Sequence, residues 1–597
     1  MAIKNFILVC GGTACESIKA EEIYQSLLRE VDDHGLKNDT QVVKTGCFGF
    51  CEKGPIVKVL PDEAFYVEVK PEDAKEIVAE NIVKGRFVKR LLYKGDDVKD
   101  KKTFDIDDIQ FYQKQYRIVL RNCGLIDPEN IEEYVARDGY KGLEKVLFEM
   151  TPDQVIEELK ESGLRGRGGA GFPTWMKWNF SKVVQSEQKY IVCNADEGDP
   201  GAYMDRSTLE GDPHSILEAM AIAGFTIGSD KGVIYIRAEY PLAIKRLEIA
   251  MKQAQEYGLL GKDILGSGFN FDIEIRLGAG AFVCGEETAL LRSIEGKRGM
   301  PTPKPPFPAV EGLWGKPTII NNVETLANIP VIMIKGGEWF SGIGTEKSPG
   351  TKVFALTGQI NNSGLVEVPM GTTLREIVYD VGGGIRDNRN FKAVQTGGPS
   401  GGVITDENLD TPIDFDSLTA IGSMMGSGGM IVMNDQDCIV NVTKFYMEFC
   451  VEESCGKCAP CRIGTKKLLQ YLDKISRGNA TEDDILKMED IGTAMKKASL
   501  CGLGQTAANP VASTIKYFKD EYIEHVDEKK CKAGKCKDLV IFKIDPEKCI
   551  GCTVCARKCP VNCISGERKQ VHVIDQERCI KCGECYKSCK FDAITKY

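Results

Sequence analysis

The alternation of apolar and polar positions divides the 597-residue chain into segments of different periodicity. Residues 1–90 predict the order β-α-β-β-α, with a first strand in "FILVC" and a first helix in "SIKAEEIYQSLLREVDDHG". Between about 115 and 340, glycine-rich loops alternate with helices and strands, which predicts an α/β domain. Residues 350–435 predict a small β-rich domain around one helix, and residues 437–520 are helical by period.

Composition excludes several classes of function. The net charge of -10 argues against nucleic acid and anionic membranes as partners. No apolar run approaches the roughly 18–20 residues that span a bilayer. The start, "MAIKNFILVCGG", predicts a strand and not a signal peptide, because its apolar run is short and no small-residue cleavage site follows. We therefore expect a cytoplasmic protein that binds neither nucleic acid nor membrane.

The 24 cysteines stand in tight clusters, which in a large cytosolic protein favours metal binding over disulfides. "IDPEKCIGCTVCARKCP" and "IDQERCIKCGECYKSCK" form an internal repeat of C-x2-C-x2-C-x3-C. This is the pattern of a two-cluster ferredoxin, in which the last cysteine of each run binds the other cluster; a pair of zinc knuckles is the weaker alternative. The predicted 4Fe–4S ligands are Cys549, Cys552, Cys555 and Cys589 for one cluster, and Cys579, Cys582, Cys585 and Cys559 for the other.

Two further cysteine groups precede the repeat. "ESCGKCAPCR" supplies C-x2-C-x2-C, which predicts a third 4Fe–4S cluster closed by a distant fourth cysteine, with zinc as the alternative. The first domain carries C-x4-C and C-x3-C and resembles the thioredoxin-like 2Fe–2S ferredoxin family. The ligands would be Cys455, Cys458, Cys461 and Cys501 for the first group, and Cys10, Cys15, Cys47 and Cys51 for the second. Cysteines without ligand spacing, Cys123, Cys193, Cys284, Cys438 and Cys563, are interpreted as small buried hydrophobic residues.

The stretch "LRGRGGAGFPTWMKW" fits the dinucleotide fingerprint G-x-G-x-x-G. A Rossmann turn follows a strand and opens a helix, but "TPDQVIEELKESGL" predicts a helix before the loop, and "FPTWMKW" is a poor helix start after it. A strand in "KYIVCNADEGDP" ends at Asp196 and Glu197. We therefore predict a different glycine loop, whose bare backbone approaches a flat cofactor and its phosphates.

The loops "GRGGAGFPT", "NADEGDPGAYMDR", "GAGAFVCGEETALL" and "PTIINNVET", with "ESCGKCAPCR", carry a resemblance. Residues of about 120–520 resemble the NADH-oxidising flavoprotein subunit of respiratory complex I and its soluble relatives. The resemblance implies FMN and NAD(H), with hydride transfer to the flavin and no catalytic side chain. The cofactor contacts it implies are Gly166, Arg167, Gly168 and Gly169 along both cofactors, Lys177 near the shared site, Asn194, Asp196, Glu197, Gly285, Glu286 and Glu287 at the flavin, Asn321, Asn322 and Thr325 at the ribityl-phosphate end, and Phe172, Phe180 and Phe307 around adenine and nicotinamide.

This sequence departs from the family at two positions. Phe282 stands where many relatives have Tyr, which removes a hydroxyl group. Asp199 stands where many have Glu, at a position associated with the adenosine ribose. Because Asp199 keeps a negative charge where a 2′-phosphate would approach, we predict NAD(H) over NADP(H).

The domain order is that of the β subunit of soluble, electron-bifurcating FeFe-hydrogenases. This resemblance implies an electron hub that couples H2, ferredoxin and NAD(H) within a higher-order hetero-oligomer, with a catalytic FeFe-hydrogenase subunit, a small thioredoxin-like 2Fe–2S subunit and ferredoxin as partners. Two alternatives remain: the diaphorase subunit of an NADP-reducing hydrogenase or NAD(P)-dependent formate dehydrogenase, and an electron-transfer scaffold without nucleotide turnover.

The predicted fold class is multidomain α/β and α+β. The expected domains are a thioredoxin-like 2Fe–2S domain (1–90), a linker (91–119), a Rossmann-like FMN and NAD(H) domain (120–345), a β-grasp-like SLBB domain (346–436), a helical 4Fe–4S bundle (437–520), a linker (521–540) and a two-cluster ferredoxin domain (541–597).

The second linker contains a candidate zinc site. His525, Cys531 and Cys536 have the spacing H-x5-C-x4-C, and structural zinc takes four such ligands. Cys450 is the expected fourth ligand, ahead of Cys438. An exposed linker with stray thiols is the alternative interpretation.

Overall fold

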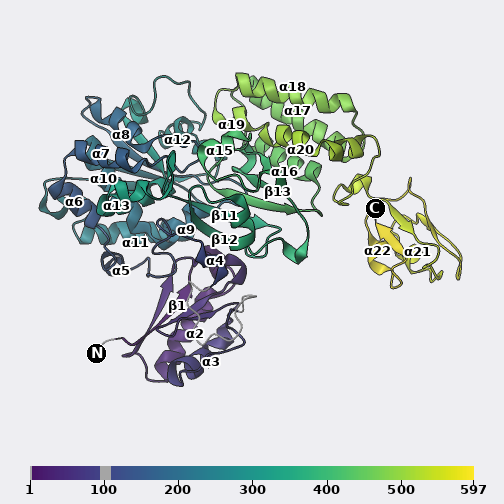
Figure 1. Ribbon diagram of the computed structural model, residues 1–597, viewed down its shortest axis with the longest axis horizontal. Helices are drawn as coiled ribbons and strands as arrows, with labels where there is room; N and C mark the ends of the chain where they lie inside the picture. The colour runs from purple at the N-terminus through teal and green to yellow at the C-terminus, as the bar shows by residue number, and fades with distance from the viewer. Residues whose placement is uncertain (1–2, 94–108, 597) are drawn as a thin grey trace. The chain divides into compact units, whose positions relative to one another are not determined.

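The computed structural model describes residues 3–93 and 109–596, which form two compact units, Met1–Val432 and Met433–Tyr597 (Figure 1). Part of the predicted linker 91–119 lies outside the described residues.

The N-terminal domain is a four-stranded sheet of order β2-β1-β3-β4 with helices packed on it. The long helix α2 is amphipathic and buries Ile23, Leu27 and Val31 against the sheet, while its opposite face is charged. Residues 1–90 thus contain the predicted strand–helix–strand order. The elements are β1 (Asn5–Cys10), α1 (Thr13–Glu16), α2 (Ala20–Asp33), β2 (Thr40–Thr45), β3 (Val57–Leu60), β4 (Ala64–Tyr66) and α3 (Ala74–Glu76), which continues into a π-helix (Ile77–Val83).

A parallel sheet of order β7-β6-β5-β8 forms the centre of the next domain. Its strands are apolar and almost fully buried at β5 and β8, as expected where helices cover the sheet. The strands are β5 (Tyr190–Ala195), β6 (Lys231–Arg237), β7 (Asp272–Gly278) and β8 (Thr318–Asn322). A short helix, α4 (Gln110–Gln113), precedes this domain and packs against the π-helix Glu376–Val381 of the β-rich domain. The helices of the parallel-sheet domain are α5 (Ile131–Val135), α6 (Lys141–Glu149), α7 (Pro152–Ser162), α8 (Thr174–Val183), α9 (Met204–Gly211), α10 (Pro213–Ile227), α11 (Pro241–Glu256), α12 (Glu287–Ile294), α13 (Val323–Lys335) and α14 (Gly337–Ser341).

The predicted β-rich domain is a mixed sheet of order β12-β11-β15-β13-β14. Strands β11 and β12 pair as an antiparallel hairpin, whereas β11 and β15 run parallel. Its elements are β11 (Thr351–Gly358), β12 (Gly364–Pro369), a π-helix (Glu376–Val381), β13 (Phe391–Thr396), β14 (Val403–Ile404), α15 (Phe415–Ala420) and β15 (Gly429–Asn434); a short hairpin of β9 (Gly344–Thr345) and β10 (Ser348–Pro349) precedes it.

The second unit combines a helical bundle with a small domain rich in cysteine. The long helices of the bundle lie side by side and bury a shared apolar core (Figure 1). Its helices are α16 (Ile439–Glu453), α17 (Ala459–Ser476), α18 (Glu482–Ala498), α19 (Gly502–Thr506) and α20 (Asn509–Val526). The small domain repeats a helix and a short strand pair: β16 (Phe542–Ile544), α21 (Val554–Lys558), β17 (Ile564–Ser565), β18 (Val573–Ile574), α22 (Glu584–Ser588) and β19 (Ile594–Lys596).

Candidate functional site

The glycine loop connects α7 to α8. Thr151 begins α7 with the reciprocal capping box that its sequence predicts, and Gly163, at φ +63°, ends it. The prediction that "FPTWMKW" is a poor helix start is wrong, because α8 begins at Thr174. Pro173 precedes the first turn, where a missing N–H leaves no helical hydrogen bond unmade and the fixed φ suits helix entry.

The base of this loop is closed by backbone contacts. The Gly166 N–H donates to the Phe172 carbonyl at 2.8 Å, and Arg165 and Pro173 form a β-bridge. Gly169 has φ +116°, and a Cβ there would lie 3.2 Å from the backbone of Gly426. A side chain at 169 is therefore disfavoured by both conformation and space.

The loop lies at the carboxyl edge of the parallel sheet. Asn194 at the end of β5 and Asn322 at the end of β8 are register partners. A Cβ on Gly168 would lie only 3.1 Å from the Cβ of Asn322. In open α/β sheets this edge is where ligands bind. The structure thus brings three of the predicted loops together.

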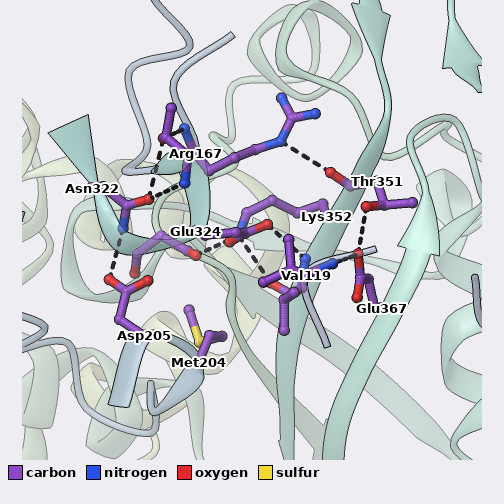
Figure 2. A network of polar contacts seen from close by, with 12 residues as sticks. Val119, Arg167, Met204, Asp205, Asn322, Glu324, Thr351, Lys352 and Glu367 are labelled. Carbon is purple, nitrogen blue, oxygen red and sulfur yellow. Dashed lines mark hydrogen bonds and ion pairs between the residues drawn. The ribbon is translucent and has the colours of Figure 1, made fainter. Parts of the chain in front are cut away.

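Asn322 organises the start of α13 (Figure 2). Its Oδ1 accepts from the Thr325 N–H at 3.0 Å, and its Nδ2 donates to Asp205 Oδ2 at 2.7 Å. The Thr325 hydroxyl oxygen in turn accepts from the Arg167 N–H at 2.8 Å. A helix N-terminus beside a bare backbone loop is suited to a phosphate group. Asn321, the other predicted asparagine, accepts from the Trp178 indole N–H at 2.9 Å.

The Arg167 side chain is directed into the protein interior and not along the glycine loop. It is fully buried, and its guanidinium donates to the carbonyl oxygens of Thr351 at 3.0 Å and Pro349 at 2.6 Å (Figure 2). The side chain therefore ties the glycine loop to β11. The contact that the resemblance implies at this position can come only from the backbone.

Sequence reasoning missed a buried ion pair beside this loop. Lys352 on β11 pairs with Glu324 on α13 (Figure 2), and both side chains are at most 1% exposed. Burial raises the pKa of Glu324, and the Lys352 ammonium partly offsets that rise. No periodicity could reveal Lys352, because nearly every position of β11 is buried. Glu367 on β12 is equally buried and accepts from the N–H groups of Ile118, Val119 and Leu120.

The three acidic residues of the loop after β5 lie in different surroundings. Asp196 is buried, and the Asn194 Oδ1 accepts from its N–H at 3.1 Å. Glu197 is buried and accepts from the N–H groups of Asp205 and Arg206, so it caps α9. Burial raises the pKa of Asp199 to about 6, and the Ser427 hydroxyl, which donates to Asp199 Oδ2 at 2.5 Å, opposes that rise.

A second acidic pair begins α12. Glu286 caps the helix through the Thr288 and Ala289 N–H groups. Burial alone would raise the pKa of Glu287, but the ammonium groups of Lys177 and Lys304 outweigh it and lower that pKa. Lys177 Nζ lies 3.6 Å from Glu287 and donates to the Ile320 carbonyl at 3.0 Å. Asn194 Nδ2 donates to the Gly285 carbonyl at 2.9 Å, which joins this segment to β5.

The predicted aromatic positions carry exposed rings. Phe172, Phe180 and Phe307 are between 43% and 58% exposed. Exposed rings of this kind can stack on the flat faces of a nucleotide. Phe282 begins the short helix Phe282–Gly285, beside Gly198 of the acidic loop.

The N-terminal domain brings its four predicted cysteines together. Cys47 Sγ lies 3.7 Å from Cys51 Sγ, and the Cys10 thiol is hydrogen-bonded to Cys15 and Cys47. Such a thiol quartet at the end of a sheet fits a 2Fe–2S cluster.

The bundle gathers the second cysteine group around helix starts. Cys458 is the N-cap of α17, and Cys501 is the N-cap of α19. Burial, followed by the nearby Cys458, Cys501 and Cys455 thiols, raises the pKa of Cys461. The four thiols therefore lie close enough to interact electrostatically, as the ligands of one cubane cluster would.

The repeat encloses two separate cavities. One is lined by Cys549, Cys552, Cys555 and Cys589, the last of which comes from the other half of the repeat. The other is lined by Cys559, Cys579, Cys582 and Cys585, together with Cys563. This interleaved grouping fits two 4Fe–4S clusters.

A fifth group gathers Cys438, His525, Cys531 and Cys536. Their ligand atoms lie within 4.8 Å of one another, and all four residues are buried. His525 Nε2 is 3.4 Å from both Cys438 Sγ and Cys536 Sγ, and its Nδ1 contacts the Glu521 carbonyl at 2.6 Å.

This group corrects two interpretations from the sequence. The fourth member is Cys438 and not Cys450, because Cys438 is the N-cap of α16, close to the end of α20 that carries His525. Cys450 stands twelve residues further along α16, about 18 Å away at the helical rise. Cys438 is therefore more than a small buried hydrophobic residue; Cys123, Cys193, Cys284 and Cys563 are buried, as interpreted.

Among the described residues, no helix has both the length and the apolar composition to cross a membrane.

Five known families match segments of the chain. The Nuo51 FMN-binding domain matches residues 159–331, and the NADH-ubiquinone oxidoreductase-F iron-sulfur binding region matches residues 441–525. The thioredoxin-like [2Fe-2S] ferredoxin matches 2–81, the SLBB domain matches 353–404, and the 4Fe-4S binding domain matches 542–565 and 572–595. The predicted fold class is thereby confirmed.

Relatives extend over most of the chain. It is 61% identical over 484 residues to "NADP-reducing hydrogenase subunit HndC" of Solidesulfovibrio fructosivorans, covering 81% of this chain and 98% of that protein. It is 42% identical over 397 residues to the NADH-quinone oxidoreductase F protein of Escherichia coli, covering 66% and 89%. The crystal structure of an NAD+-reducing [NiFe]-hydrogenase in the H2-reduced state is similar at TM-score 0.61 and 28% identity, covering 88% of this chain and 86% of that one.

The fold and this site define an NAD(P)H:acceptor oxidoreductase that uses a flavin and iron–sulfur clusters. More specifically, the chain belongs to the NuoF/Nuo51 family of FMN-binding subunits. Its cofactors are FMN, one 2Fe–2S cluster and three 4Fe–4S clusters.

Proposed function

We propose that this chain is the NAD(P)H-oxidising flavin and iron–sulfur subunit of an NADP-reducing hydrogenase. The observation that carries the proposal is its 61% identity to HndC over 98% of that protein. The sequence leaves this function as an alternative, and the comparisons support it better than an electron-bifurcating FeFe-hydrogenase coupling H2, ferredoxin and NAD(H).

We infer that the nucleotide and flavin occupy the carboxyl edge of the parallel sheet. The backbone of residues 166–169, the N-terminus of α13 and the asparagines of β5 and β8 would hold FMN. Lys177 and the exposed Phe172, Phe180 and Phe307 rings would hold the dinucleotide, and Glu287, predicted at the flavin, lies beside Lys177. The predicted contacts at Asp196, Glu197, Gly285 and Glu286 stay proposals at the same edge.

When bound, FMN supplies an acceptor for hydride that can pass electrons on singly to iron–sulfur clusters. The contribution of the chain is orientation and electrostatics. Lys177 and Glu287 form a fixed ion pair at the sheet edge, and the glycine loop presents only backbone, so a flat ring can approach closely. No side chain at this edge is required as an acid or base.

The name of the HndC relative supports a place for this chain in a multisubunit hydrogenase. A catalytic hydrogenase subunit would exchange electrons with H2. The further partners that the sequence resemblance implies, a small thioredoxin-like 2Fe–2S subunit and ferredoxin in a cytoplasmic hetero-oligomer, are part of the same proposal. In this assembly the chain would act as the electron hub, with Cys455, Cys458, Cys461 and Cys501 holding one cluster of the electron path.

We further propose that Cys438, His525, Cys531 and Cys536 bind one structural zinc ion. Three thiols and one imidazole are a common zinc set, and four ligands close a tetrahedral site. The Glu521 carbonyl beside His525 Nδ1 leaves Nε2 for the metal.

The function is tested by anaerobic reduction of benzyl viologen by the purified chain with FMN and clusters in place. We expect turnover with NADPH. Turnover with NADH alone would support the nucleotide preference predicted from Asp199 and would count against the NADP-reducing assignment. Cluster reduction by dithionite without viologen reduction by either nucleotide would instead support the electron-transfer scaffold.

A further inference from the structure

The carboxylate of Asp199 is held by the β-rich domain. The Ser427 hydroxyl donates to its Oδ2 at 2.5 Å, from the loop between α15 and β15. Gly398, in the turn between β13 and β14 of the same sheet, approaches so closely that a Cβ there would lie 2.6 Å from Asp199 Oδ1. One oxygen of the carboxylate is thus fixed by a hydroxyl, and the other faces a glycine that leaves room beside it.

The Ser427 loop is itself anchored to the flavin site. Lys352 Nζ donates to the Ser427 carbonyl at 2.6 Å and pairs with Glu324, whose other oxygen accepts from the Val353 N–H at 2.9 Å. Glu324 stands two residues after Asn322, at the start of α13 (Figure 2). A continuous set of polar contacts therefore runs from the α13 N-terminus through Lys352 to Ser427 and Asp199.

We propose that Ser427 is a positioning residue for Asp199, through which the β-rich domain takes part in the discrimination between NADH and NADPH. The inference rests on the proposed function, because it requires a dinucleotide at this edge. The Ser427 hydrogen bond fixes the direction of the carboxylate. Held in that way, Asp199 can accept from a ribose 2′-hydroxyl and repel a 2′-phosphate.

Loss of the hydroxyl frees the carboxylate to rotate, so discrimination against the 2′-phosphate weakens whichever nucleotide the enzyme prefers. In S427A the ratio of kcat/KM for NADH to that for NADPH should fall by about threefold or more, as expected for a lost hydrogen bond to a charged group. The change should lie in KM, with kcat altered by less than about twofold. S427T, which keeps the hydroxyl, should restore the ratio.

Two comparisons separate this role from a general effect on the loop. Ser423 lies on the same loop, and its hydroxyl contacts Thr396 and not Asp199, so S423A should leave the ratio unchanged. In a D199N background, S427A should cause no further change, because the two residues act as one unit.

An unchanged ratio in active S427A, or an equal effect of S427A in D199N, would overturn the inference while leaving the proposed function intact. A wild-type holoprotein that turns over neither nucleotide would overturn both.

Discussion

At the scale of the residue, burial decides the state of the acidic groups at the sheet edge. Asp199 and Glu197 both have raised pKa values because they are removed from water, whereas Glu287 keeps a lowered pKa because Lys177 and Lys304 lie beside it. The same site thus contains carboxyl groups of different charge at moderately acidic pH.

This difference predicts a pH-dependent nucleotide preference. The pKa of Asp199 is raised to about 6, so its charge is present above that pH and is lost as pH falls through it. The ratio of kcat/KM for NADPH to that for NADH should therefore rise as the pH is lowered from about 8 to about 5.5. The 2′-phosphate, with a second pKa of roughly 6, contributes in the same direction.

D199N separates the two contributions, because only the phosphate titrates in that variant. We expect the pH dependence of the ratio to be clearly shallower in D199N than in the wild-type protein. Identical pH profiles for the two proteins would contradict the assignment of a titrating carboxylate at position 199.

The sequence could indicate Asp199, Asn322 and the cysteine sets, because each stands in a motif with its own spacing. It could not indicate Lys352 or Ser427, which reach the site from a separate sheet more than a hundred residues after Asp199. The interpretation of Cys438 as a small buried hydrophobic residue was wrong for the same reason. Its partners lie beside it in space but stand 87 or more residues later in the sequence.

At the scale of the element, helix ends position most of the chemistry. The starts of α12, α13 and α17 carry Glu286, Asn322 and Cys458, and α7 begins at the Thr151 capping box and ends at Gly163. The start of α8 was not predictable from propensity alone, because a proline just before a helix also suits an extended segment.

The junction of α16 and α20 predicts a structural metal. Protein isolated without chelators should contain about one zinc per chain, because three thiols and an imidazole meet there. The double substitution C531S/C536S should abolish zinc and increase proteolysis between residues 527 and 541.

C450A is the matched control, since it removes a buried cysteine from the same helix α16 but outside the group. It should retain zinc. Absence of zinc from the wild-type protein, or equal zinc loss in C450A, would refute the site.

At the scale of the whole molecule, the order of domains followed from cysteine spacing and loop motifs, because ligand spacing is a local property of the sequence. The packing around the proposed flavin site could not be predicted from the sequence. It depends on contacts between Arg167 and β11 and between Lys352 and α13, which join separate segments of the chain. The predicted domain boundaries stay predictions. The chain combines a sheet edge, where we propose that the nucleotide binds, with four cysteine groups suited to clusters.

An anaerobic titration with NADPH and NADH, followed by EPR, tests this account most directly. The loaded chain should contain about 14 irons, from one 2Fe–2S and three 4Fe–4S clusters. Nucleotide should bleach the flavin and produce the spectra of both reduced cluster types. A fully loaded chain whose flavin and clusters stay oxidised with either nucleotide, yet are reduced by dithionite, would contradict the central claim.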